Sequence, residues 1–178
     1  RYLDNGSNPG PLWSEPGFDD SAWSSGTAQF GYGEDDESTT ISFGDDDRDK
    51  FPAAYFRTSF EVTSPENLTN IGLRVLVDDG AVLYLNGQEI SRLRMNVGAV
   101  DYLSYASSQG PENQFDTISL APSQLRPGTN VIAVEVHQSN ATSSDLSFDL
   151  EIVAHRLPDA FERVDEIVYG QQSADVSY

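Results

Sequence analysis

Carboxylates are the most concentrated reactive groups of this sequence, and they form two dense runs at residues 34–37 and 45–49. The second run places aspartates at the first three ligand positions of an EF-hand calcium loop, but Lys50 stands at that motif's glycine position and Phe56 at its glutamate position. Crowded carboxylates repel one another unless a cation neutralises them. We therefore expect a calcium site of another type, completed by backbone carbonyls, with an acidic loop that holds no ordered ion as the alternative. The expected ligands are Asp35, Asp36, Asp45, Asp47 and Asp49.

Aromatic residues among polar neighbours offer a second kind of chemistry. A sugar ring presents an apolar C–H face, so an exposed aromatic ring flanked by hydrogen-bonding side chains is a common saccharide platform. Residues 93–113 hold two tyrosines within a long polar stretch. The alternative is that these rings fold back over the edge of the core. The candidate carbohydrate-binding residues are Tyr102, Tyr105, Phe51, Asp78 and Asp79.

Catalytic motifs are scarce in this sequence. His137 and His155 are its only histidines, and it contains no nucleophile elbow, zincin motif or phosphate-binding loop. His137 precedes a polar stretch that contains Asp145, and we expect it to donate a hydrogen bond that holds this stretch rather than to bind a metal. Because any acidic loop contains carboxylate pairs, a glycosidase-type pair is the remaining catalytic alternative. We predict a protein that is not an enzyme.

The charge balance excludes one large class of partners. The 29 acidic and 10 basic residues give a net charge of −19, and Lys50 is the only lysine. Binding to phosphate backbones needs clustered Lys and Arg, so we expect no nucleic-acid partner. Cysteine is absent, which excludes disulfides and thiolate metal sites. No apolar run reaches the roughly 18 residues of a membrane span, and we expect no membrane partner.

The elements that must position these residues are strands. Short segments of alternating or continuous apolar residues are bounded by Gly, Pro, Asn and Asp, and none shows a sustained helical period. This pattern predicts an all-β fold, an antiparallel β-sandwich. Asp78-Asp79-Gly80 and Asn86-Gly87 predict tight hairpin turns within a meander. The predicted strands are residues 53–62, 71–77, 81–85, 88–92, 115–120, 131–137 and 146–154, with one helical turn at 122–125.

Strand alternation also predicts where the candidate residues meet. If successive strands run antiparallel, their connections fall at alternate ends of the sandwich. Residues 33–52, 78–80, 93–113 and 139–145 then reach the same end, which we call the rim. The rim receives the long, polar connections, and such loops often carry function. We therefore expect the acidic runs and the tyrosines to lie close together.

Three segments resemble a known family, and they occur in the right order. Residues 18–23 (FDDSAW), 77–87 (VDDGAVLYLNG) and 128–136 (GTNVIAVEV) are similar to segments of galactose-binding-like jelly rolls, the β-sandwich accessory domains of many secreted carbohydrate-active and other extracellular proteins. The similarity covers residues 1–154. It implies a jelly-roll fold and, as in many members, a structural calcium ion, and it makes Trp13 and Trp23 packing residues.

The sequence thus predicts a non-catalytic, extracellular carbohydrate-binding module at residues 1–157, secreted or on the cell surface. It would bind a polysaccharide or glycan, hold calcium, and tether neighbouring domains of the same chain to that polymer. Residues 158–178 are expected to be a linker or the start of a following domain, in which residues 164–169 are a candidate edge strand. The alternative function is a structural spacer or protein-interaction module that binds no sugar.

Overall fold

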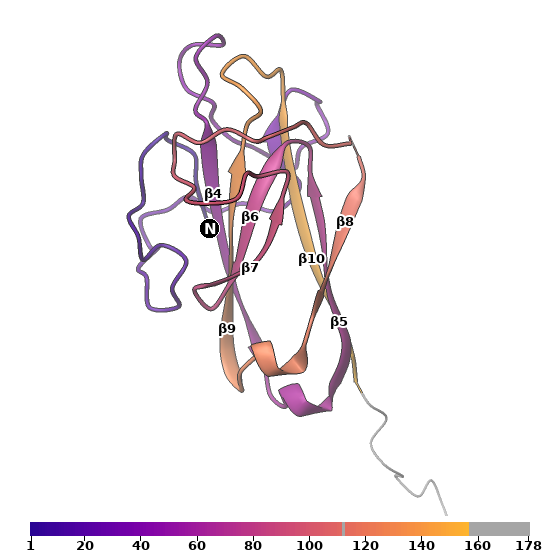
Figure 1. Ribbon diagram of the computed structural model, residues 1–178. Coiled ribbons are helices and arrows are strands. Elements are labelled where there is room, and N and C mark those ends of the chain that lie inside the picture. Colours follow the sequence, from indigo (N-terminus) through magenta and orange to yellow (C-terminus); the bar gives the residue numbers. More distant parts are fainter. Residues whose placement is uncertain (112, 157–178) are drawn as a thin grey trace, which may run out of the picture.

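The protein folds as an all-β sandwich of two five-stranded sheets (Figure 1). A computed structural model describes residues 1–111 and 113–156, so the expected linker and its candidate edge strand lie outside the described residues. The strands are β1 (Tyr2–Leu3), β2 (Phe30–Tyr32), β3 (Thr39–Thr40), β4 (Ala53–Val62), β5 (Leu68–Val77), β6 (Gly80–Leu85), β7 (Gln88–Leu93), β8 (Phe115–Leu120), β9 (Gly128–His137) and β10 (Leu146–Arg156), with short 3-10 helices η1 (Pro65–Asn67) and η2 (Pro122–Gln124).

The two sheets differ in strand order. The first sheet has the order β1-β4-β9-β6-β7, and the second has the order β3-β2-β10-β5-β8. Neighbouring strands are antiparallel throughout, except for the short parallel pair β2 and β3. The prediction of a mostly antiparallel sandwich is therefore confirmed. The described residues contain no helix long and apolar enough to cross a bilayer.

Of the two predicted hairpin turns, one is a hairpin and the other connects the two sheets. Asn86-Gly87 forms the hairpin between β6 and β7, and both residues have the positive φ that such a turn requires, 52° and 84°. Asp78-Asp79-Gly80, by contrast, carries the chain from β5 in one sheet to β6 in the other. The prediction of a hairpin there, and of a meander through it, is wrong. Local turn chemistry reverses the chain in either case but does not select the partner strand.

The core lies between the two sheets. Alternate side chains of each central strand enter it, so that Val75 and Val77 of β5 meet Leu83 of β6 and Val134 of β9. Because the opposite sheets supply these side chains, the core needs β5 and β6 on different layers. Phe60 is half-buried beside this core, and the buried members include Leu83, Leu85, Val134, Val136 and Phe148.

A second, smaller apolar cluster covers the outer face of the first sheet. Trp13 and Trp23 are buried there against Tyr55 of β4 and Ala133 of β9. They belong to the N-terminal segment, which runs along the outside of this sheet (Figure 1). The packing role predicted for both tryptophans is confirmed. This covered face matters for function, because the same segment forms a wall of the pocket described below.

Candidate ligand-binding site

The predicted rim exists, and strand registers define it. Ala53 at the start of β4 and Gly80 at the start of β6 both pair with His137 at the end of β9. At the same end, Leu146 at the start of β10 pairs with Tyr32 at the end of β2. The connections 33–52, 78–79, 94–114 and 138–145 therefore meet at one end, opposite η1 and η2 (Figure 1). The alternation of strand direction expected from the sequence therefore predicted this end correctly.

The acidic runs at the rim do not converge on one point. The five expected calcium ligands are all exposed: Asp35, Asp36, Asp45, Asp47 and Asp49. Within residues 1–111 and 113–156, no group of three or more His, Asp or Glu side chains is arranged to hold a metal ion. Calcium binding stays a prediction of the sequence.

Lys50 supplies a positive charge between the rim loops. Its side chain is buried, and its Nζ donates to the carbonyl oxygens of Ser143 at 2.7 Å and Asp47 at 3.1 Å. The ammonium also lies 5.3 Å from the centre of the Phe43 ring. Lys50 thus ties connection 33–52 to connection 138–145. The residue that breaks the EF-hand pattern in the sequence is a structural tie in the fold.

Asp78 and Asp79 hold the rim together from inside. Asp79 is 2% exposed, and its Oδ2 accepts from the Ser139 backbone N–H at 2.6 Å. Burial, together with the neighbouring Asp79 and Asp145 carboxylates, raises the pKa of Asp78 to about 7. Burial also raises the pKa of Asp79. Arg94 donates to the Asp79 carbonyl at 2.6 Å, which fixes the start of connection 94–114. The Asp79 carboxylate is bonded to the protein itself, whereas Asp78 Oδ1 is buried without a hydrogen-bond partner among the described residues. A sugar-binding role for the two aspartates stays a prediction.

The other predicted sugar contacts are distributed along the rim. Phe51 is half-buried, and its ring covers Gly6 and Gly44 closely enough that a Cβ at Gly6 would lie 2.5 Å from the ring. Tyr105 is 38% exposed. Tyr102 is half-buried and packs against the outer cluster of Trp13 and Tyr55. Of these three aromatic candidates, Tyr102 lines a pocket together with other aromatic rings.

We call this cavity the aromatic pocket, and it lies on the outer face of the first sheet. It encloses about 330 Å³. Trp13 meets Tyr55 and Tyr84 edge-on, with ring centres 4.8 Å and 5.4 Å apart. The lining consists of residues of the N-terminal segment, of strands β4, β6 and β9, and of connection 94–114: Asn8, Gly10, Pro11, Trp13, Ser14, Tyr55, Tyr84, Val100, Asp101, Tyr102 and Glu135.

Strand alternation explains why three of these side chains face the pocket. Leu83 and Val134 point into the core, so their neighbours Tyr84 and Glu135 point outward. Tyr55 lies directly opposite Glu135 in the pairing of β4 with β9. The register therefore brings two phenols and a carboxylate together without any loop. A sugar-binding role for Tyr55, Tyr84 or Glu135 was not predicted, although their period-two alternation with core residues was visible in the sequence.

Glu135 is the polar centre of the pocket floor. It is 3% exposed, and the Tyr84 hydroxyl donates to its Oε1 at 2.6 Å. Burial, and then this bond to Glu135, raises the pKa of Tyr84. Burial likewise raises the pKa of Tyr55, and the Glu135 and Asp101 charges add to that effect. Both phenols are therefore neutral hydrogen-bonding groups in ordinary buffers.

His137 links this floor to connection 94–114. Its ring is fully buried, and its Nδ1 lies 2.8 Å from the Ser104 carbonyl oxygen, which can only accept a hydrogen bond. Nδ1 therefore carries a proton, and Nε2 lies 3.4 Å from Glu135 Oε2. His137 was expected to hold the stretch near Asp145. It instead holds the loop that carries Tyr102, because its outward-facing position on β9 directs the ring toward that loop.

Asp101 shapes the turn that presents Tyr102. Its Oδ1 accepts from the Leu103 backbone N–H and from the Ser104 hydroxyl, both at 3.0 Å. Tyr102 therefore lies between Asp101, which caps the turn, and Ser104, whose carbonyl oxygen is bonded to His137. This arrangement ties Tyr102 to the sheet through Ser104 and His137.

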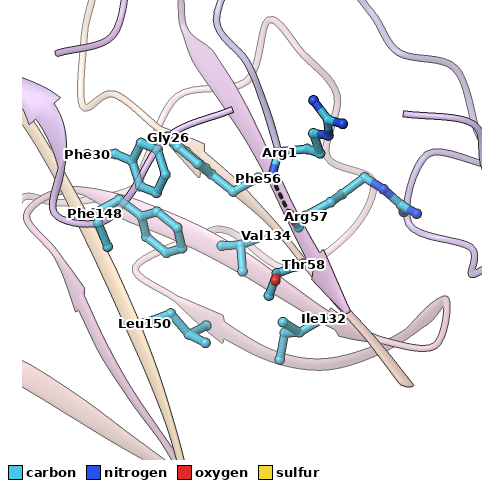
Figure 2. Close-up of a pocket in the computed structure, with 11 residues that line it drawn as sticks. Arg1, Gly26, Phe30, Phe56, Arg57, Thr58, Ile132, Val134, Phe148 and Leu150 are labelled. Carbon is cyan, nitrogen blue, oxygen red and sulfur yellow. Dashed lines mark hydrogen bonds between the residues drawn. The ribbon is translucent and has the colours of Figure 1, made fainter. Parts of the chain in front are cut away.

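A second cavity, of about 220 Å³, opens between the two sheets (Figure 2). Its walls are mainly apolar, with Phe56 and Val134 from one sheet and Phe30 and Phe148 from the other. The hydrogen bond drawn in Figure 2 runs from the Arg1 amino group to the Arg57 carbonyl at 2.7 Å. A sugar needs convergent hydrogen-bonding groups as well as an apolar surface. The aromatic pocket meets that requirement better than the cavity between the sheets.

Comparison with known proteins supports the fold class. No protein-family model matches this sequence, and no curated protein matches it. A β-glucuronidase from glycoside hydrolase family 2 is similar in structure, with a TM-score of 0.50 and 17% identity, over 77% of this chain and 13% of that one. The Bacteroides uniformis β-glucuronidase has a TM-score of 0.52 and 17% identity, over 79% of this chain and 14% of that one.

These likenesses show the fold alone. The chain spans about one seventh of the length of the two glucuronidases that it resembles. The class of protein that the fold defines is therefore an all-β sandwich.

Proposed function

We propose that this chain is a non-catalytic carbohydrate-binding domain of the galactose-binding-like jelly-roll type. It acts outside the cell and tethers neighbouring domains of its own chain to a polysaccharide. The observation that carries this proposal is the aromatic pocket, where Trp13, Tyr55, Tyr84 and Tyr102 surround the buried carboxylate of Glu135. The likeness to parts of glycosidase chains supports the same context.

The pocket has the composition that a sugar ring requires. Ligand sites typically range from about 300 to 1,000 Å³, so a volume of about 330 Å³ is at the small end of that range. Tyrosine and tryptophan rings offer faces or edges to the C–H groups of the ring, while the Asp101 carboxylate and the phenols can bond its hydroxyls. The affinity expected of one open pocket is micromolar to millimolar, about −4 to −8 kcal/mol.

The contacts of the carboxylates support a binding rather than a catalytic role. Glu135 accepts from Tyr84 and faces His137, while Asp101 caps a turn. Glu135 is thus engaged in positioning the protein, and Asp101 uses its Oδ1 for the turn. A glycosidase needs two carboxyl groups across the scissile bond, one to donate a proton and one to attack or activate water.

Two tyrosine variants test the proposal as a matched pair. Tyr102→Ala removes a ring from the pocket, whereas Tyr105→Ala removes a ring from the same loop outside it. On a panel of insoluble polysaccharides and glycans, the unmodified chain should be retained on at least one polymer. Tyr102→Ala should weaken that binding by about tenfold or more, because it loses the ring's contact area. Tyr105→Ala should bind as the unmodified chain does.

The same panel identifies the competing outcomes. Both variants should keep a cooperative thermal melt, which shows that any loss of binding is local. A folded chain that binds no glycan would be a spacer or a protein-interaction module instead. Loss of binding in Tyr105→Ala with full binding in Tyr102→Ala would place the site elsewhere on the rim.

Calcium is a separate part of the proposal, based on the acidic runs of the sequence. An ion that binds only the folded state raises the free energy of unfolding, by about 2.7 kcal/mol at a hundredfold excess over its dissociation constant. Chelation should therefore lower the melting temperature, and added calcium should restore it. An unchanged melt in chelator, with elemental analysis showing that the metal has been removed, would contradict a structural ion.

A further inference from the structure

We propose that the aromatic pocket selects a sugar that carries a protonated amine over neutral sugars and over uronic acids. This inference rests on the proposed carbohydrate-binding function and adds the chemical class of the ligand. Two features of the lining carry it. Among the residues that the structure describes, the lining contains carboxylates and no basic residue, and aromatic rings line the same cavity.

The charge of the lining is entirely negative. Glu135 lies on the floor and Asp101 at the edge, and within residues 1–111 and 113–156 no Lys, Arg or His lines the pocket. His137 lies beneath the floor with its Nε2 3.4 Å from Glu135 Oε2, and Asp101 at the edge adds a second carboxylate that has no histidine beside it in the lining. These charges would repel a ligand carboxylate and attract an ammonium group.

Basic side chains near the pocket are already paired. Arg92 donates to both carboxylate oxygens of Glu89, at 2.6 Å and 2.8 Å. Arg57, on the same face of the sheet, bonds Asp20 at 2.8 Å and the Trp13 and Glu15 carbonyl oxygens. Neither guanidinium belongs to the lining. Nothing basic in the lining is therefore available to bind the carboxylate of a uronic acid.

The rings add a second source of selectivity. The face of an aromatic ring attracts a cation through its quadrupole, and tyrosine and tryptophan rings do so best. Trp13, Tyr55, Tyr84 and Tyr102 provide four such rings within one cavity. An ammonium group held between these rings and Asp101 would gain both cation–π and ionic contacts. A neutral hydroxyl at the same position would gain only a hydrogen bond.

The test uses four β-1,4-linked tetrasaccharides that share one backbone. The glucosamine tetramer carries ammonium groups at mildly acidic pH, the N-acetylglucosamine and glucose tetramers are neutral, and the glucuronic acid tetramer is anionic. Calorimetric titration of the full chain should give about tenfold tighter binding of the glucosamine tetramer than of the glucose tetramer. The glucuronic acid tetramer should bind most weakly.

Two charge-removing variants place the selectivity in the pocket. Asp101→Asn keeps the oxygen that caps the turn, and Glu135→Gln keeps the oxygen that accepts from Tyr84. Each should reduce the ratio of glucosamine to glucose affinity by at least about threefold. Because the chain carries a net charge of −19, a cationic sugar could also adhere nonspecifically. The control is Glu66→Gln, which removes one exposed charge at the opposite end of the sandwich and should leave the ratio unchanged.

The outcomes separate this inference from the function on which it rests. Binding of the glucose tetramer without a preference for glucosamine would overturn the amine selectivity and keep the carbohydrate-binding proposal. An equal fall of the ratio in Glu66→Gln and in Asp101→Asn would likewise overturn it, because the attraction would then belong to the whole surface. Failure of all four tetramers and of every polysaccharide would overturn both.

Discussion

Lys50 shows at the scale of one residue how an acidic rim is stabilised. The acidic run beside it suggested a metal, but the buried group that bridges the loops is this ammonium, bonded to the carbonyls of Asp47 and Ser143. This ammonium group joins carbonyl oxygens of two rim connections, as a bound metal ion would. It also lies against the Phe43 ring, which favours a cation at that position.

Replacing Lys50 by methionine should therefore destabilise the protein. Methionine fills a similar volume but leaves the two carbonyl groups without their donor, and a lost bond to a charged group costs about 2–3 kcal/mol. The check is urea unfolding, with exposed Arg48→Met as the matched control that removes a charge two residues away. We expect a lower midpoint for Lys50→Met only. Equal midpoints for the two variants would show that Lys50 is not a tie.

At the scale of elements, the sequence predicted the long strands well and the short ones poorly. The segments 53–62 and 115–120 match β4 and β8 in both bounds, and the other five predicted strands overlap observed ones. The missed strands are only two or three residues long: β1, β2 and β3. Such lengths are too short for alternation to be visible, so tertiary pairing alone defines them.

The partners of the strands were harder to predict than their positions. Asp78-Asp79-Gly80 has the composition of a hairpin turn, yet it connects the two sheets. The predicted end of the sandwich was nevertheless correct, because a crossover between sheets reverses the chain just as a hairpin does. The direction of each strand determines which loops share the rim. Strand pairing depends instead on the packing of the whole core.

The candidate site, too, could be predicted only in part from the sequence. Tyr102 was predicted from its loop, and the structure places it in a pocket with rings that come from strands. Tyr84 and Glu135 lie in such strands, where each is flanked by core residues and follows the period of two. The walls from the N-terminal segment could not be predicted, because they depend on Trp13 packing across β4 and β6. The outward-facing residues of regular strands can be predicted from the sequence, whereas the packing of a distant segment across them cannot.

At the scale of the whole molecule, the acidic pair Asp78 and Asp79 and the net charge of −19 both lower the free energy of unfolding as pH rises. The pKa of Asp78 is raised from 3.8 to about 7, because the fold buries the carboxyl beside Asp79 and Asp145. Between those values the folded state binds more protons than the unfolded state, so the free energy of unfolding must fall as pH rises. Mutual repulsion among the surface carboxylates grows over part of the same range and also opposes folding.

The protein should therefore be more stable at pH 5 than at pH 7.5. The contribution of Asp78 is fully present below pH 3.8 and is lost as pH rises through about 7. After allowance for its partial exposure, this amounts to ~2 kcal/mol, or roughly 4–8 °C in melting temperature for a domain of this size. Carboxylates with lowered pKa values, such as Glu89, act in the opposite sense only at more acidic pH. Thermal melts across this range measure the slope.

Asp78→Asn isolates the contribution of this single carboxyl from that of the acidic surface. Asparagine is close in shape and has no charge to lose, so the variant should show a smaller slope between pH 5 and pH 7.5, due to surface repulsion and to the raised pKa of Asp79. Added salt screens the surface charges far more than a buried carboxylate. The slope that Asp78 contributes should therefore persist in high salt, whereas the residual slope of the variant should shrink. A variant with the full slope of the unmodified chain would assign the pH dependence to the surface instead.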